Sequence, residues 1–140
     1  KKGYHFSNCI YCNARQDQYR ILRAVSGFFL AEDGSYTGAA EHIVQGITDE
    51  EKRKEMRRML DLTHLKECYQ KGEESVEILC EYREGSEGEA LCRGKVTILF
   101  YDAAEDGGLH HFLMGFERFR FNEEAARNET VRAGGAYRSL

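Results

Sequence analysis

Apolar and polar positions alternate most clearly in the second half of the chain. Every second side chain of residues 75–82 is apolar: Val76, Ile78, Cys80 and Tyr82. This is the period of a strand that is buried on one face. The same pattern predicts strands over residues 93–101 and 109–119. The loops between them are short, polar and glycine-containing, so we expect successive antiparallel neighbours, that is, a three-strand meander.

Helical spacing precedes this predicted sheet. Apolar side chains three or four positions apart predict a helix over residues 14–31. Its buried face would carry Tyr19, Leu22, Val25 and Phe29. A second, short helix is predicted over residues 37–45, with Thr37 as its N-cap and Gly46 just past its end.

Two further helices are predicted from their capping residues. Thr48 and Glu51 have the spacing of a capping box, in which each residue satisfies a free amide of the other. They begin a helix that ends at about Leu60, and Asp61 or Thr63 caps another short helix after it. The sequence therefore predicts helices first and strands second.

Composition and charge limit the class of protein. The chain has 140 residues and a net charge of −4, with acidic and basic residues interleaved. The length fits one domain with its own core, and the absence of a basic stripe argues against nucleic-acid binding. No apolar run approaches the ~20 residues of a membrane-spanning helix. The five cysteines are an odd number, which predicts reduced thiols in a cytoplasmic protein rather than a disulfide framework.

Three segments resemble parts of the degenerate PAS domains of bacterial signalling proteins. Residues 20–29 (RILRAVSGFF) resemble the entry helix of these domains, and residues 51–65, beginning EKRKEMRRMLDL, resemble their middle helices. Residues 113–117 (LMGFE), followed by the charged residues 122–124, are similar to their last strand and exit. The resemblance covers about residues 16–126.

The resemblance implies an α+β fold in three parts. Residues 1–13 would be an N-terminal segment, and residues 14–121 a PAS-like domain with N-terminal helices packed on the three-strand meander. Residues 122–140 would be a C-terminal exit helix and tail. The family also has a two-stranded hairpin that pairs with the last strand at the centre of a five-stranded sheet. This hairpin looks missing here, so we expect the strand from Leu109 to Phe119 to have an edge without its family partner. Phe28 to Ala31, Gly3 to Phe6 or a second copy of the chain would cover it, and we expect a homodimer through this edge.

The resemblance also implies a function. PAS domains sense small molecules or mediate dimerisation within larger signalling proteins, and they commonly precede diguanylate cyclase (GGDEF) or histidine kinase modules. We expect a non-catalytic module without a cofactor, which signals by shifting the population of its exit helix between two states. The sequence contains no nucleophile elbow, no phosphate-binding glycine loop, no zinc-protease helix and no GGDEF motif.

A ligand cleft between sheet and helices would be lined by seven apolar side chains. They are Phe29, Met56, Ile98, Phe100, Phe112, Met114 and Phe116. The last three share one face of a predicted strand, and Met56 would make a cavity adaptable. An ordinary filled core is the other interpretation, because apolar stripes are usually core.

The alternative prediction is a small zinc-stabilised protein-interaction module. Cys9 and Cys12 have the spacing of a zinc-ligand pair, and His5 lies where a third ligand can stand. His64 or Cys68, four residues apart on one helix face, would supply the fourth ligand. Because a second close-spaced pair is not evident, two free thiols in a terminal segment remain the other interpretation.

Two further polar groups have ordinary structural interpretations. His110 and His111 are adjacent on a predicted strand, so they point to opposite faces and do not readily share a metal. The basic side chains of one predicted helix are Arg53, Lys54, Arg57 and Arg58. We expect them to pair with neighbouring glutamates at helical spacing rather than to hold a phosphate.

Overall fold

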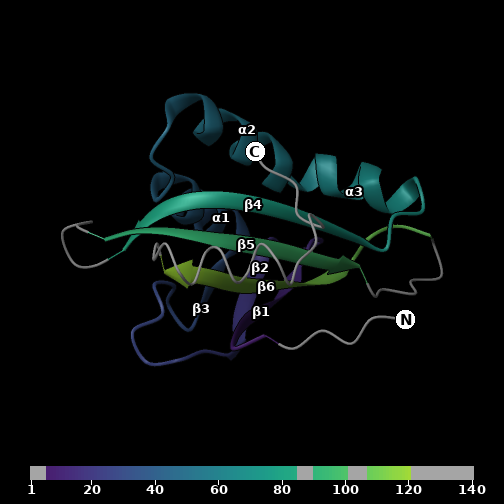
Figure 1. Cartoon of the computed structure of the whole chain (residues 1–140). Coiled ribbons are helices and arrows are strands. Elements are labelled where there is room, and N and C mark those ends of the chain that lie inside the picture. Colours follow the sequence, from purple (N-terminus) through teal and green to yellow (C-terminus); the bar gives the residue numbers. More distant parts are fainter. Residues whose placement is uncertain (1–5, 85–89, 101–106, 121–140) are drawn as a thin grey trace.

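An antiparallel sheet of six strands and three helices make up the described part of the chain, which is residues 6–84, 90–100 and 107–120 of a computed structural model. The elements in chain order are β1 (Asn8–Asn13), β2 (Gln18–Arg23), β3 (Asp33–Ser35), α1 (Tyr36–Gln45), α2 (Glu50–Leu60), α3 (Leu62–Gln70), β4 (Ser75–Glu84), β5 (Ala90–Phe100) and β6 (His111–Arg120). The strand order is β3-β2-β1-β6-β5-β4, and the helices form a layer on one side of the sheet (Figure 1). The class is α+β, but the predicted three-strand sheet is wrong because it is only half of the sheet.

The first two strands form a hairpin where the sequence predicted a helix over residues 14–31. In the turn, the Asn13 carboxamide oxygen accepts hydrogen bonds from the amides of Arg15 (3.0 Å) and Gln16 (2.9 Å). Asp17 then adopts a positive φ of 53°, a conformation that Asn and Asp tolerate better than most residues. This local turn chemistry reverses the chain and brings β2 against β1.

The apolar residues that have helical spacing within residues 14–31 are not the ones whose side chains are buried. Of its four apolar positions only Tyr19 is buried, and it faces the core from β2. The other three are the exposed large hydrophobic side chains of the described residues: Leu22 (46%), Val25 (54%) and Phe29 (42%). The pairing of β2 with β1 therefore overrides the helical pattern.

β6 lies in the middle of the sheet, between β1 and β5. Met114 on β6 is opposite Ile98 of β5 on one side and Ile10 of β1 on the other. The meander β4-β5-β6 is confirmed, but the strand edge that was to carry a homodimer, within Leu109 to Phe119, is occupied by β1 over residues 111–116. A hairpin of β1 and β2 therefore lies at the strand edge that was expected to be free.

The three helices after β3 follow the sequence prediction closely, apart from their first residues. Ser35 and Asp49 are the N-caps of α1 and α2, so the predicted caps Thr37 and Thr48 are wrong by one or two positions. Asp61 caps α3 as predicted. Each capping oxygen accepts from a backbone amide two or three residues later, at 3.0 to 3.1 Å, which satisfies one of the free amides at the helix start.

The outer face of the sheet, opposite the helices, is covered at one point by Phe6. Phe6 is buried and its ring lies against Gly115 of β6, where a Cβ atom would overlap the ring. Thr97 of β5, opposite Gly115 in the ladder, is also buried, and its hydroxyl has no hydrogen-bond partner among the described residues. The residues just before β1 therefore pack on the face that the helices leave open.

Candidate functional site

Most of the predicted cleft residues meet between the helices and the sheet. Met56 of α2, Ile98 of β5, and Phe112 and Met114 of β6 are fully buried in one hydrophobic cluster. Phe100 of β5 packs against this cluster and is partly buried. The strand pairing explains the arrangement, because Ile98 lies opposite Met114, and Phe100 opposite Phe112, on the helix-facing side of the sheet. We call this region the helix–sheet interface.

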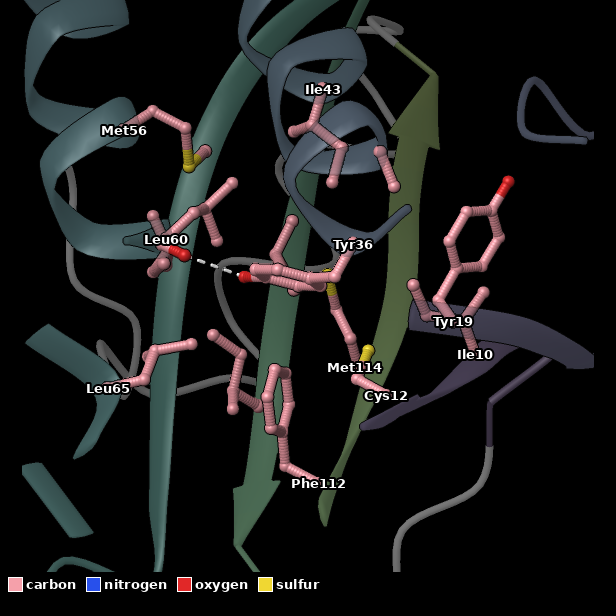
Figure 2. Close-up of a cluster of buried hydrophobic side chains, with 14 of the residues drawn as sticks. Ile10, Cys12, Tyr19, Tyr36, Ile43, Met56, Leu60, Leu65, Phe112 and Met114 are labelled. Atoms are coloured by element: carbon pink, nitrogen blue, oxygen red, sulfur yellow. Dashed lines mark hydrogen bonds between the residues drawn. The ribbon is translucent and has the colours of Figure 1, made fainter. Parts of the chain in front are cut away.

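Tyr36 lies at the centre of the helix–sheet interface, and sequence analysis did not single it out. Its hydroxyl donates a hydrogen bond to the carbonyl oxygen of Leu60 at 2.7 Å, drawn as the dashed line in Figure 2. Its ring meets the Phe112 ring edge to face, with centroids 5.3 Å apart. One side chain therefore joins the start of α1, the end of α2 and β6. The sequence signal that was available is its position directly after Ser35, a residue type that favours helix N-caps.

The ionisable groups of this interface keep their protons. Burial raises the pKa of the Tyr36 hydroxyl well above its usual range, and Cys12 and Asp61 nearby raise it further. Burial also raises the pKa of the Cys12 thiol well above 9.0 and that of Cys80 to about 12. A neutral, apolar interface suits an apolar ligand and does not suit proton transfer or thiolate chemistry.

The remaining two predicted cleft residues, Phe29 and Phe116, lie in an aromatic group at the border of the interface. The Phe29 ring meets Phe116 of β6 at 5.8 Å and His42 of α1 at 5.4 Å, both edge to face. Phe28 contacts Phe29 at 4.9 Å and Phe116 at 5.3 Å. We call Phe28, Phe29, His42 and Phe116 the aromatic border. Phe29 remains 42% exposed, so this group connects the helix-facing side of β6 with the protein surface.

The segment between β2 and β3 holds the aromatic border in place. The Val25 amide donates to the Asn8 side-chain oxygen at 2.8 Å, and the Tyr19 hydroxyl donates to the Ala31 carbonyl at 2.8 Å. Between these anchors, Gly27 has a φ of 83° and no atom near the place of a Cβ. The segment is thus tied at both ends and turns at Gly27, in a backbone conformation that favours glycine. Phe28 and His42 of the aromatic border were not predicted, because only the fold brings them to Phe116.

The predicted metal ligands do not come together. Cys12 points into the helix–sheet interface, whereas Cys9, three residues earlier on β1, is only partly buried and lies opposite Gly115. Residues an odd number apart on a strand face opposite sides, so these two thiols do not share an ion. The third predicted ligand, His5, lies outside the described residues. No cluster of three metal-ligating side chains occurs in residues 6–84, 90–100 and 107–120.

His64 and Cys68 are neighbours on α3, as their spacing predicted. The His64 Nε2 and Cys68 Sγ atoms are 3.5 Å apart. Burial and the carboxylate of Glu73 raise the pKa of the Cys68 thiol, so it stays protonated and the contact is an ordinary hydrogen bond.

Two of the four predicted basic side chains of α2 pair with glutamates at helical spacing, as expected, and Arg57 pairs with a glutamate of another helix. Arg53 pairs with Glu50 at 3.0 Å, and Arg58 pairs with Glu55. Arg57 reaches across to Glu41 of α1 at 2.9 Å. An open depression of about 620 Å³ between α2 and α3 is lined by Lys54, Arg57 and Arg58 together with Asp61 and Glu67, and both of its arginines are paired with glutamates.

His110 and His111 do not form a joint site. Their ring centroids are 6.3 Å apart, and the His111 ring stacks on Tyr11 of β1 at 5.4 Å. The guanidinium carbon of Arg20 on β2 lies over the Tyr11 ring, 4.9 Å from the ring centroid. The His111 ring therefore takes part in packing on the sheet, and both histidines are partly buried, whereas one exposed histidine was expected.

Comparison of this chain with protein-family models, with curated proteins and with solved structures finds no match. Among the helices of the described residues, none has the length and apolar character that crossing a membrane requires. The case for a function therefore depends on the fold and on the helix–sheet interface.

Proposed function

We propose that this chain is a PAS-like sensory domain, a non-catalytic module that binds a small apolar molecule between its helices and its sheet. The observation that carries the proposal is the strand order. In the PAS family a two-stranded hairpin pairs with the last strand at the centre of the sheet, and here the β1–β2 hairpin lies beside β6. The helices come between β3 and β4 in the chain, which agrees with the family's order of a hairpin, helices and a meander.

The aromatic border is the proposed entrance for the ligand. Phe29 is half exposed and covers Phe116, and beyond Phe116 along β6 lie the buried side chains of Met114 and Phe112. A ligand that displaces the Phe29 ring would reach apolar, uncharged side chains. The turn at Gly27, whose backbone has no close neighbour at the Cβ position, lets this segment change conformation without disturbing β2.

β6 is the proposed route of the signal. It carries Phe112 and Met114 in the helix–sheet interface and Phe116 in the aromatic border. The chain continues from β6 to the predicted exit helix in residues 122–140, which lie outside the described residues. A ligand that binds one arrangement of β6 more tightly than another shifts the population of the two states, and only this difference in affinity transmits a signal.

The state of the cysteines supports the proposed cytoplasmic location. Cys9, Cys12, Cys68 and Cys80 are all free thiols. Reducing compartments keep thiols unpaired, whereas secreted domains of this size commonly use disulfides. Mass mapping of the protein from its own cell would contradict the proposed location if it found these thiols joined in disulfides.

Native mass spectrometry of the purified chain, beside a denatured sample, tests the sensory function. We expect an organic adduct that is released on denaturation. Phe29→Ala removes the ring that would close again over the bound molecule at Phe116, so the molecule should dissociate faster and the adduct's occupancy should fall. Val25→Ala is the matched control, because Val25 belongs to the same segment and is even more exposed, at 54%, yet it has no ring in the aromatic border.

Two results would contradict the proposal. One is a bare chain whose unfolding temperature is not raised by any compound of a chemically diverse library of small apolar molecules. The other is an adduct whose occupancy is the same in wild type and in Phe29→Ala, because the ligand would then enter elsewhere. Equal stability of the two variants, measured by thermal unfolding, separates a lost contact from a lost fold.

A further inference from the structure

β4 forms one edge of the sheet along its full length of ten residues (Figure 1). It pairs with β5 in an unbroken register from Ser75 to Glu84, and the chain contains no proline. Within the described ranges, no segment pairs with its other side. Proteins protect such an edge with a bulge, a proline, a short strand or charged side chains, and of these β4 has only charged side chains. The edge therefore offers a regular row of backbone donors and acceptors.

The pairing shows which residues of β4 present their backbone groups to that edge. The Phe100 amide donates to the Glu74 carbonyl at 3.1 Å, so Glu74 and Phe100 form a hydrogen-bonded pair. Hydrogen-bonded and non-hydrogen-bonded pairs alternate along an antiparallel ladder. Glu77, Leu79 and Glu81 are consequently the residues whose N–H and C=O groups point away from β5. Their side chains lie on the outer face of the sheet.

Acidic and basic side chains alternate from strand to strand on this outer face. The Lys95 Nζ atom on β5 lies between Glu77 of β4 (3.8 Å) and Glu117 of β6 (3.7 Å). Glu81 is opposite Arg93 of β5 in the ladder. The outermost row, on β4, is therefore acidic. The next strand in such a pattern would be basic.

We propose that β4 binds an extended basic segment of a partner protein as an added antiparallel strand. Two lysine or arginine side chains, four residues apart in the partner, would lie opposite Glu77 and Glu81. An apolar side chain midway between them would lie opposite Leu79. The backbone hydrogen bonds give affinity and the charge pairs give specificity, as in other cases of strand addition.

The helix layer limits the remaining positions of the partner strand. Figures 1 and 2 both place α2 and α3 on the β4 side of this layer, and Leu65 of α3 lies beside β4 in Figure 2. The partner side chains that alternate with the basic and apolar ones point to this side. They are therefore small, such as alanine, serine or threonine.

In the register that buries Leu79 against itself, a second copy of the chain fits this edge less well than a basic segment does. It would bring the same acidic row, and the antiparallel register centred on Leu79 would place Glu77 against Glu81 on both sides of the axis. Like charges directly opposite each other destabilise a strand pair. The glutamates thus disfavour an acidic strand and a second copy in this register, and they favour a basic strand.

Binding of a fluorescent synthetic peptide to the full chain tests the proposal. The peptide has lysines at its second and sixth positions, valine at the fourth and threonine or alanine elsewhere, and its matched control has glutamates in place of both lysines. We expect fluorescence anisotropy to show binding of the lysine peptide alone. Glu77→Gln with Glu81→Gln should weaken it about threefold to tenfold. Glu117→Gln, on the same face but two strands from the edge, should leave it unchanged.

Two further experiments show whether the peptide binds at this edge: reversing the charges of Glu77 and Glu81, and measuring amide hydrogen exchange along β4. Glu77→Lys with Glu81→Lys should bind the glutamate peptide in preference to the lysine peptide. In the wild type, the bound lysine peptide should protect the amides of Glu77, Leu79 and Glu81 from exchange, whereas those of Ile78 and Cys80 are protected already. Equal binding of both peptides, protection at other strands, or protection of these amides by self-association of the free chain would each overturn the proposal.

Discussion

The hydroxyl group of Tyr36 makes a hydrogen bond whose removal can be predicted in detail. It donates to the carbonyl oxygen of Leu60, the last residue of α2, and both residues are only 1% exposed. The last carbonyl groups of a helix have no partner within the helix, so this hydroxyl satisfies an acceptor that would otherwise be buried and unpaired. Tyr36→Phe removes the bond and keeps the ring contact with Phe112.

The expected cost follows from the burial of the carbonyl. A buried acceptor that loses its partner costs about 1–3 kcal/mol, so we expect Tyr36→Phe to lower the free energy of unfolding by about 2 kcal/mol. Tyr19→Phe is the matched control. The Tyr19 hydroxyl donates to the Ala31 carbonyl at a similar distance, 2.8 Å, but Ala31 is exposed. Water can replace that bond, so the control should cost less than about 1 kcal/mol.

Urea unfolding followed by far-ultraviolet circular dichroism measures both costs. This signal reports the backbone, so the loss of a tyrosine does not disturb it. An unchanged slope with denaturant shows that the variants expose the same surface on unfolding as the wild type. The account of Tyr36 would be refuted by a loss no larger than that of Tyr19→Phe, because the Leu60 carbonyl would then be satisfied by something else.

Three other predictions concern the outer face, alkaline pH and the helix surface. Gly115→Ala pushes a Cβ atom into the Phe6 ring and should cost about 1–3 kcal/mol in urea unfolding; in a Phe6→Ala background it should cost clearly less, and additive losses would argue against this packing. Burial raises the pKa of Cys80 from 9.0 to about 12, so above pH 9 the unfolded chain binds fewer protons and stability falls as pH rises. Unfolding in reducing buffer across that range should show the fall, Cys80→Ala should flatten it in part, and a flat wild-type profile would count against this burial. Arg57 holds the pKa of Glu41 down at about 2, but the pair is on the surface, so Glu41→Gln should change the free energy of unfolding by less than about 1 kcal/mol, and a larger loss would mean that it fastens α1 to α2.

The parts of the fold that the sequence predicted correctly are those with local signals. The meander β4-β5-β6 follows from period-two alternation and short polar loops. Asp61, which is the N-cap of α3, marks the start of that helix in the sequence. The hairpin β1–β2 was missed because its identity depends on a distant partner. Ile10 becomes a buried strand residue only when it lies opposite Met114, far along the chain. Without that partner, the spacing of Tyr19, Leu22 and Val25 suggested a helix.

The candidate site was predictable in composition but not in arrangement. Met56, Ile98, Phe112 and Met114 could be named because large apolar residues on regular elements usually become core. Tyr36 and His42 could not, because their roles depend on how α1 is placed against α2 and β6. The exposure of Phe29 could not be predicted for the same reason, because the predicted helix over residues 14–31 would have placed its side chain on the buried face.

The position of the β1–β2 hairpin beside β6 is the observation on which the proposed function depends. Nuclear magnetic resonance of the full chain tests it directly through nuclear Overhauser contacts between backbone protons. The account predicts cross-strand contacts that join Ile10 to Met114 and Cys12 to Phe112, in the register of an antiparallel pair. Sequential amide contacts of a helix over residues 14–31, without contacts between β1 and β6, would contradict the fold and leave the sensory proposal without support.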